Sequence, residues 1–150
     1  MLRWIDMPPV WLLVALALAC AQAEFWPMGL SFGSGWPDFL GGLLVGGGLL
    51  LIVLAATEFR RWRTTIIPGE APRHMITTGV FKWSRNPIYL GDAMILAGLI
   101  FYWDAVPSLV LIPAFVRVIE RRFIRPEEDR MRRLFRADFA RYCKKTRRWV

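Results

Sequence analysis

The distribution of basic residues constrains the fold of this chain more than any other feature of its sequence. All 20 Lys and Arg lie within the first three residues, between positions 60 and 85, or from position 117 onward. The two stretches without any, residues 4–59 and 86–116, are strongly apolar. Charge is costly in hydrocarbon, and basic loops that alternate with apolar spans are typical of a multi-pass membrane protein with those loops in the cytosol.

The composition supports a membrane protein. Hydrophobic residues make up 55% of the 150 residues, more than is usual for a soluble domain. A formal net charge of +8 also occurs in nucleic-acid-binding proteins, but confinement of the basic residues to loops and a tail favours a surface beside anionic lipid. We therefore predict one all-α domain, residues 1–150, that spans the bilayer and has no nucleic-acid partner.

Four spans are predicted, at about residues 7–23, 38–57, 87–103 and 108–119. The last two are shorter than the ~20 residues that cross a bilayer, and we interpret them as a tight helical hairpin. The first also fits a signal peptide cleaved after Ala21-Gln22-Ala23, but because further spans follow we expect it to be retained. Both termini then lie in the cytosol, and we expect a multi-pass protein of a bacterial inner membrane.

Glycines are concentrated in the second predicted span. Gly42 and Gly46 have the four-residue spacing that lets a neighbouring helix approach closely. A phosphate-binding loop is disfavoured, because no strand precedes these glycines and no Gly-Lys-Ser follows them. We therefore interpret them as helix-packing residues.

A basic amphipathic helix is predicted in the tail, residues 120–150, as a new or re-phased helix near Arg125. Pro126 suits the first turn of a helix, and Glu127 and Glu128 place negative charge at its positive end. Apolar residues then recur at helical spacing between arginines: Met131, Leu134, Phe135, Phe139 and Tyr142. Such a helix lies on the membrane surface or closes over a site.

No metal site and no disulfide are expected. Cys20 lies in an apolar stretch and Cys143 in the basic tail, so the charge distribution places them in different environments. The only histidine, His74, has no neighbouring residues at metal-ligand spacing.

A polar and aromatic segment, residues 77–91, separates the second and third spans. Gly79 permits a turn, Arg85 and Asn86 offer side-chain donors, and Pro87 suits the first turn of the span that follows. If the last two spans pair, this segment and residues 117–129 meet at one end of the hairpin. A site there has a lipid-facing side for an apolar group and a water-facing side for a polar one.

Several motifs in fixed order resemble the integral-membrane isoprenylcysteine carboxyl methyltransferases and the related phospholipid methyltransferases. They are residues 74–81, residues 85–91, Glu127-Glu128, and the ending from Leu134-Phe135 to Tyr142. The resemblance implies an S-adenosylmethionine-dependent methyltransferase acting on a membrane-associated amphiphile. Carboxyl O-methylation of an isoprenylcysteine-like substrate is the first expectation, and phospholipid or thiol methylation stay open.

Carried over by position, the resemblance implies a cytosolic pocket for S-adenosylmethionine. The expected cofactor contacts are Arg73, His74, Met75, Ile76, Gly79, Phe81, Asn86, Pro87, Ile88, Tyr89, Glu127 and Glu128. As catalytic residues it implies Glu127 and an arginine that holds an acidic substrate group, which is Arg121, Arg122 or Arg125.

The sequence departs from the family pattern at two positions. Asn86 stands where the eukaryotic enzymes have a histidine before proline, and Arg136 stands where glycine is usual. A carboxylate acceptor needs no base, whereas an amine or thiol does, and the candidates are then Glu127, Glu128, His74 and Tyr89. Asp92 lies one turn into a span, where an ionisable group needs a partner or a role.

Two further function classes stay open. Residues 86–92 are also similar to a motif in membrane sterol reductases, although those chains are much longer. A non-catalytic scaffold whose basic tail recruits anionic lipid also fits, but it should tolerate loss of Asn86, Tyr89 and Glu127. The expected partners are the bilayer and an amphiphilic or prenylated substrate, and the oligomeric state is left open.

Overall fold

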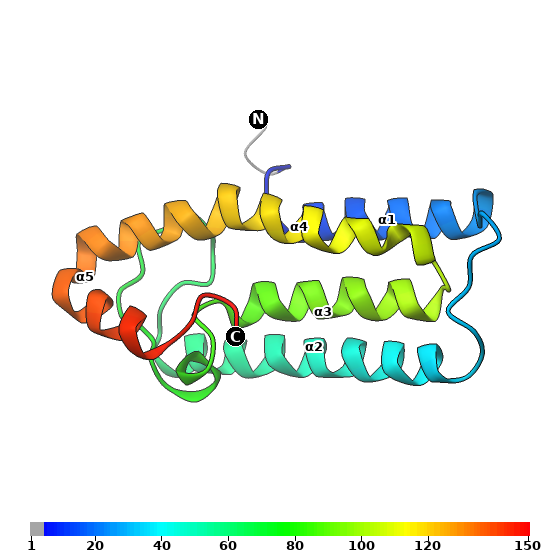
Figure 1. Ribbon diagram of the computed structural model, residues 1–150. Helices are drawn as coiled ribbons and strands as arrows, with labels where there is room; N and C mark the ends of the chain where they lie inside the picture. The colour runs from blue at the N-terminus through cyan, green and yellow to red at the C-terminus, as the bar shows by residue number, and fades with distance from the viewer. Residues whose placement is uncertain (1–4) are drawn as a thin grey trace.

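The computed structural model describes residues 5–150 and is helical apart from its loops (Figure 1). Its elements are α1 (Pro8–Phe25), α2 (Trp36–Arg61), η2 (Gly79–Lys82), α3 (Pro87–Tyr102), η3 (Val106–Val110), α4 (Leu111–Ile119), η4 (Glu120–Ile124) and α5 (Arg125–Lys145). The predicted all-α class is confirmed for this part of the chain, which contains no strand. Arg3, which supports the predicted N-terminal orientation, lies outside the described residues.

The four helices α1 to α4 form an antiparallel bundle. In Figure 1, α2 packs along α3, while α1 and α4 lie on the opposite side of α3. The start of α1, the end of α2, the start of α3 and the end of α4 all lie at the same end of the bundle (Figure 1). We call this the α3-start end, and here α5 extends beyond the bundle before it turns back.

Two of the helices, α1 and α2, have the length and hydropathy of a membrane span. The apolar helix α3 has 16 residues and α4 has 9, both below the ~20 residues usual for a span. The helix α2 has 26 residues and extends beyond both ends of the predicted span 38–57. The four-span topology therefore stays a prediction.

Glycines bring α2 and α3 into close contact. A Cβ added at Gly98 would lie 2.6 Å from the carbonyl oxygen of Gly41, and one added at Gly91 would lie 2.7 Å from that of Gly48. No side chain larger than hydrogen fits between these backbones. The predicted contact pair was wrong, because a Cβ added at Gly42 or at Gly46 would have no heavy atom of another helix within 4 Å. Glycine packing occurs, but through Gly41 and Gly48 on another face of α2.

The tail helix is re-phased, as the sequence predicted, but no break separates it from α4. The π-helical turn η4 joins α4 directly to α5. A π-turn inserts an extra residue and so rotates the face that a helix presents. Ile119, Phe123 and Ile124 are therefore all buried across the junction. Glu127 contacts Tyr89 in the first turn of α3, and Glu128 contacts Arg85 just before that helix.

The helix α5 reverses direction at Arg136, where φ is 41° and ψ is −111°. A Cβ is crowded in this conformation, which favours glycine. Glycine is also the residue that the resembled family usually has here. After the reversal, the buried side chains of Phe139 and Tyr142 face back toward the bundle, and Tyr142 Oη donates to the Phe81 carbonyl oxygen at 2.7 Å.

We expect Gly98→Ala to destabilise the folded protein by about 1–3 kcal/mol, because the added methyl group forces the two backbones apart. Thermal unfolding of the full chain in lipid nanodiscs measures this change. Gly42→Ala makes the same substitution on the open face of α2 and should keep or slightly raise Tm, since alanine favours a helix over glycine. Equal Tm values for the two variants would contradict the close contact at Gly98.

Candidate functional site

Two adjoining cavities lie at the α3-start end of the bundle. The loop cavity, of about 150 Å³, is lined by the segment 65–76, the residues before α3, and α5. The helix cavity, of about 270 Å³, is lined by the first turns of α1 and α3 and by α2. The residues common to both walls are Phe59, Ile66, Phe81, Arg85, Asn86 and Glu127. The two cavities are thus neighbouring parts of one site.

Most of the predicted cofactor residues line this site. The loop cavity has His74, Ile76, Phe81, Asn86, Glu127 and Glu128 on its wall. The helix cavity has Phe81, Asn86, Pro87, Ile88, Tyr89 and Glu127. Arg73, Met75 and Gly79 are on neither wall. Gly79 instead packs against Glu58, whose carboxyl carbon would lie 2.8 Å from a Cβ added there.

The first turns of α3 and α5 are joined by a hydrogen bond inside the site. Tyr89 Oη donates to Glu127 Oε1 at 2.8 Å. Burial raises the pKa of Glu127 to about 6, although the Tyr89 hydrogen bond and the charge of Arg130 oppose this shift. Glu127 therefore titrates nearer to neutrality than an ordinary glutamate, on the wall shared by the two cavities.

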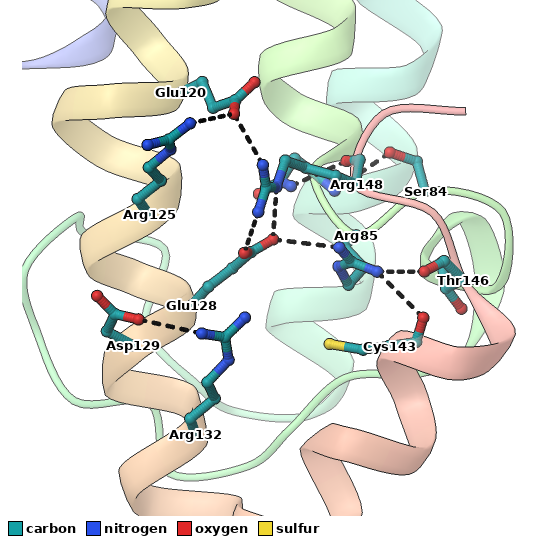
Figure 2. Close-up of polar contacts among 11 residues, drawn as sticks. Ser84, Arg85, Glu120, Arg125, Glu128, Asp129, Arg132, Cys143, Thr146 and Arg148 are labelled. Atoms are coloured by element: carbon teal, nitrogen blue, oxygen red, sulfur yellow. Dashed lines mark hydrogen bonds and ion pairs between the residues drawn. The ribbon is translucent and has the colours of Figure 1, made fainter.

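The neighbouring Glu128 has the opposite environment (Figure 2). Its two carboxylate oxygens accept hydrogen bonds from Arg148 Nε at 3.0 Å and Nη2 at 2.8 Å, and Arg85 Nη2 lies 3.3 Å away. Burial alone would raise the pKa of Glu128, but the hydrogen bonds and charges of Arg148 and Arg85 hold it below its ordinary value. The adjacent glutamates therefore differ: Glu128 is neutralised by arginines and Glu127 is not.

Arg85 and Asn86 connect the site to the C-terminal tail. Arg85 Nη1 donates to the Thr146 carbonyl oxygen and, at 3.4 Å, to that of Cys143. Arg85 Nε is buried and has no partner among residues 5–150. Asn86 Nδ2 donates to the Arg148 carbonyl oxygen at 2.9 Å, which leaves Asn86 Oδ1 as an acceptor for a ligand.

The three arginines predicted to orient an acidic acceptor are on neither cavity wall. Arg122 Nη2 lies 2.7 Å from Asp6 Oδ2, and the guanidinium lies over the Trp11 ring, 5.3 Å from its centroid. Arg125 pairs with Glu120 at 3.3 Å (Figure 2), and Arg121 is exposed. These arginines anchor helices or face outward, whereas Arg85 lines both cavities.

Two charged residues of the site were not assigned to the cofactor from the sequence. Asp92 lines the helix cavity and is 7% exposed. Arg130 lines the loop cavity. The position of Asp92 within an apolar span was a sequence signal for a role, whereas Arg130 is one of many arginines in the tail and nothing in its neighbourhood distinguishes it.

We expect Glu127→Gln to stabilise the protein by about 2 kcal/mol at pH 7.5 and by much less at pH 4.5. The pKa of Glu127 is about 6 in the folded state against an ordinary 4.5. The folded state therefore binds this proton more tightly, and stability is lost as pH rises from about 4.5 to 6. Glutamine removes the buried charge, and its amide oxygen can still accept the Tyr89 hydrogen bond.

Thermal unfolding in nanodiscs at the two pH values measures this effect. Asp129→Asn is the matched control, because Asp129 is in the same turn of α5 and its side chain is 60% exposed. If both variants changed Tm equally at each pH, the unusual environment of Glu127 would be contradicted.

Residues 36–138 match the family model for phospholipid methyltransferases. No curated protein and no solved structure matches the chain. The matched segment runs from the start of α2 into the second part of α5 and contains both Tyr89 and Glu127. The chain therefore belongs to the phospholipid methyltransferase family, within the isoprenylcysteine carboxyl methyltransferase superfamily.

Proposed function

We propose that this protein is an S-adenosylmethionine-dependent methyltransferase whose acceptor is a membrane lipid with a basic nitrogen in its head group. Membership of the phospholipid methyltransferase family supports the reaction and the methyl donor. The observation that carries the choice of acceptor is the presence of two carboxyl groups, those of Asp92 and Glu127, on the wall of the helix cavity.

The loop cavity suits S-adenosylmethionine. Its apolar residues offer a surface for an adenine ring. Glu127 and Asn86 Oδ1 are acceptors for an ammonium group or hydroxyls, and the unpartnered Arg85 Nε is a donor for a carboxylate. When bound, the cofactor supplies an electrophilic methyl group on a sulfonium. The apolar part of the wall includes Phe59, Ile66, Ile67, Ile76, Phe81, Met131 and Phe139.

Asp92 supports an amine as the acceptor. It is 7% exposed, and among residues 5–150 no group donates a hydrogen bond to its side chain or pairs with it. A buried carboxylate is costly unless an opposite charge compensates it, and a protonated amine supplies that charge. The amine must lose a proton before its lone pair can attack a methyl group, and Asp92 and Glu127 line the cavity as acceptors for that proton.

A carboxylate acceptor, as in isoprenylcysteine enzymes, is the second candidate. It is favoured by the buried Arg85 Nε, which has no partner among the described residues and belongs to a side chain on both cavity walls. An acidic acceptor would, however, meet the like charges of Asp92 and Glu127 in the helix cavity. This repulsion is not offset by Arg121, Arg122 or Arg125, because none of them lies on either cavity wall.

Isothermal titration of the full chain in nanodiscs with S-adenosylmethionine tests the cofactor. We expect micromolar binding that Glu127→Gln weakens at least tenfold, because the ligand loses a charged acceptor. Asp129→Asn should bind like the wild type. A folded protein that binds a nicotinamide cofactor instead would support a reductase, and one that binds neither would support a scaffold.

The same samples test the acceptor, through transfer of a labelled methyl group to nanodisc phosphatidylethanolamine or to a farnesylated cysteine. We expect methylation of the amine lipid, with kcat/KM reduced about 100-fold or more by Asp92→Asn because the proton acceptor is lost. Unchanged S-adenosylmethionine binding shows that this variant is folded. Methylation of the farnesylated cysteine alone, insensitive to Asp92→Asn, would support the carboxylate acceptor instead.

We further propose that α1 to α4 all span the membrane, with both termini in the cytosol of a bacterium. The gathering of basic segments at the α3-start end of the bundle supports this orientation (Figure 1), since basic loops stay in the cytosol. A reporter fused after Val150 should therefore be active only in the cytosol. Activity of that fusion outside the cytosol would overturn the topology.

A further inference from the structure

The last residues of the chain, 146–150, form a strap that returns to the site after α5 ends (Figures 1 and 2). The Arg85 backbone N–H donates to the Arg147 carbonyl oxygen at 3.0 Å, and Asn86 Nδ2 donates to that of Arg148. Trp149 packs against the hydrophobic core. The strap lies outside the segment that matches the family, residues 36–138.

The Arg148 side chain joins the strap to two parts of the long α4–α5 helix. Its Nε and Nη2 donate to the two oxygens of Glu128, and its Nη1 donates to Glu120 Oε1 at 2.8 Å (Figure 2). The Glu128 side chain is 8% exposed and that of Arg148 is 31% exposed. A bidentate ion pair that is largely shielded from water is stronger and more directional than a surface ion pair.

Arg148 is on neither cavity wall, but two residues that it holds line the loop cavity: Asn86 and Glu128. Its main-chain carbonyl oxygen accepts a hydrogen bond from Asn86 Nδ2, so Asn86 Oδ1 is the side-chain atom left to bind a ligand. Its guanidinium donates hydrogen bonds to both carboxylate oxygens of Glu128. Of the acidic pair, only Glu127 therefore has carboxylate oxygens that are not paired with an arginine.

We propose that Arg148 is a positioning residue, which shapes the cofactor site by holding Glu128 and Asn86. This inference rests on the proposed function, because it assigns the loop cavity to S-adenosylmethionine. It also changes the role expected for Glu128, from a direct cofactor ligand to a wall residue neutralised by arginines. Without the Arg148 guanidinium, Glu128 would be a second carboxylate beside Glu127 with only Arg85 to compensate it. The strap would also lose the side-chain contacts that hold in place the main-chain carbonyl to which Asn86 donates.

Titration of the full chain in nanodiscs with S-adenosylmethionine tests the proposal. We expect Arg148→Gln to raise Kd at least tenfold. Arg148→Lys keeps the charge but loses the bidentate pair, so it should raise Kd less, and it provides the measurement if the Gln variant does not fold. Arg132→Gln is the matched control, because it also removes one positive charge, in this case from the exposed ion pair of Arg132 with Asp129 on α5. The side chains of that pair are 61% and 60% exposed, and the substitution should leave Kd unchanged.

A double-mutant cycle separates positioning from a merely structural role. If Arg148 acts through Glu128, the double variant Glu128→Gln/Arg148→Gln should have a Kd for S-adenosylmethionine no higher than that of the single variant that binds more weakly. Fold-increases in Kd that multiply in the double variant would overturn this role, as would unchanged Kd in both Arg148 variants. Thermal unfolding without cofactor, on the same samples, must show that all variants are folded at the titration temperature. Absence of binding by the wild type would instead refute the proposed function, and the strap inference with it.

Discussion

The buried carboxylate of Glu128 is the constraint on which the geometry of the site depends. It lies where three segments distant in sequence meet: the residues before α3, the start of α5 and the C-terminal strap. A buried carboxylate is stable only with partners, and Arg85 and Arg148 provide them. Because each of these arginines also contacts backbone or another acid, the single carboxylate fixes the positions of all three segments.

Two departures from regular α-helix geometry allow the tail to reach Glu128 and the cavities. The π-turn η4 rotates the face of the continuous helix, so that both glutamates of the acidic pair point toward the start of α3. The reversal at Arg136 then sends Phe139, Tyr142 and the strap back toward the bundle. Without the reversal, the second part of α5 would continue away from the bundle, and the loop cavity would lose Phe139 and Tyr142 from its wall.

Much of the fold and of the candidate site could be predicted from local sequence. Pro87 and the apolar residues after it specified α3, and the segment before it contributed residues to both cavities. The contacting glycines were misassigned because spacing alone does not reveal which side of α2 meets α3. The sequence did not reveal where the three predicted arginines lie relative to the cavities, for a similar reason: Arg122 pairs with Asp6, which is 116 positions away, and no local pattern marks that pairing.

The sequence by itself determined the helical architecture and the chemical types of residue at the site. Hydrocarbon excludes charge and requires every backbone group to be bonded within a helix, so the distribution of charged and apolar residues is enough to indicate such a fold. Tertiary structure alone decided which of two adjacent glutamates is neutralised, which glycines touch and which arginines line the cavities. These outcomes depend on the rotation of each helix about its axis and on pairing between distant segments, and neither is encoded in a local stretch of sequence.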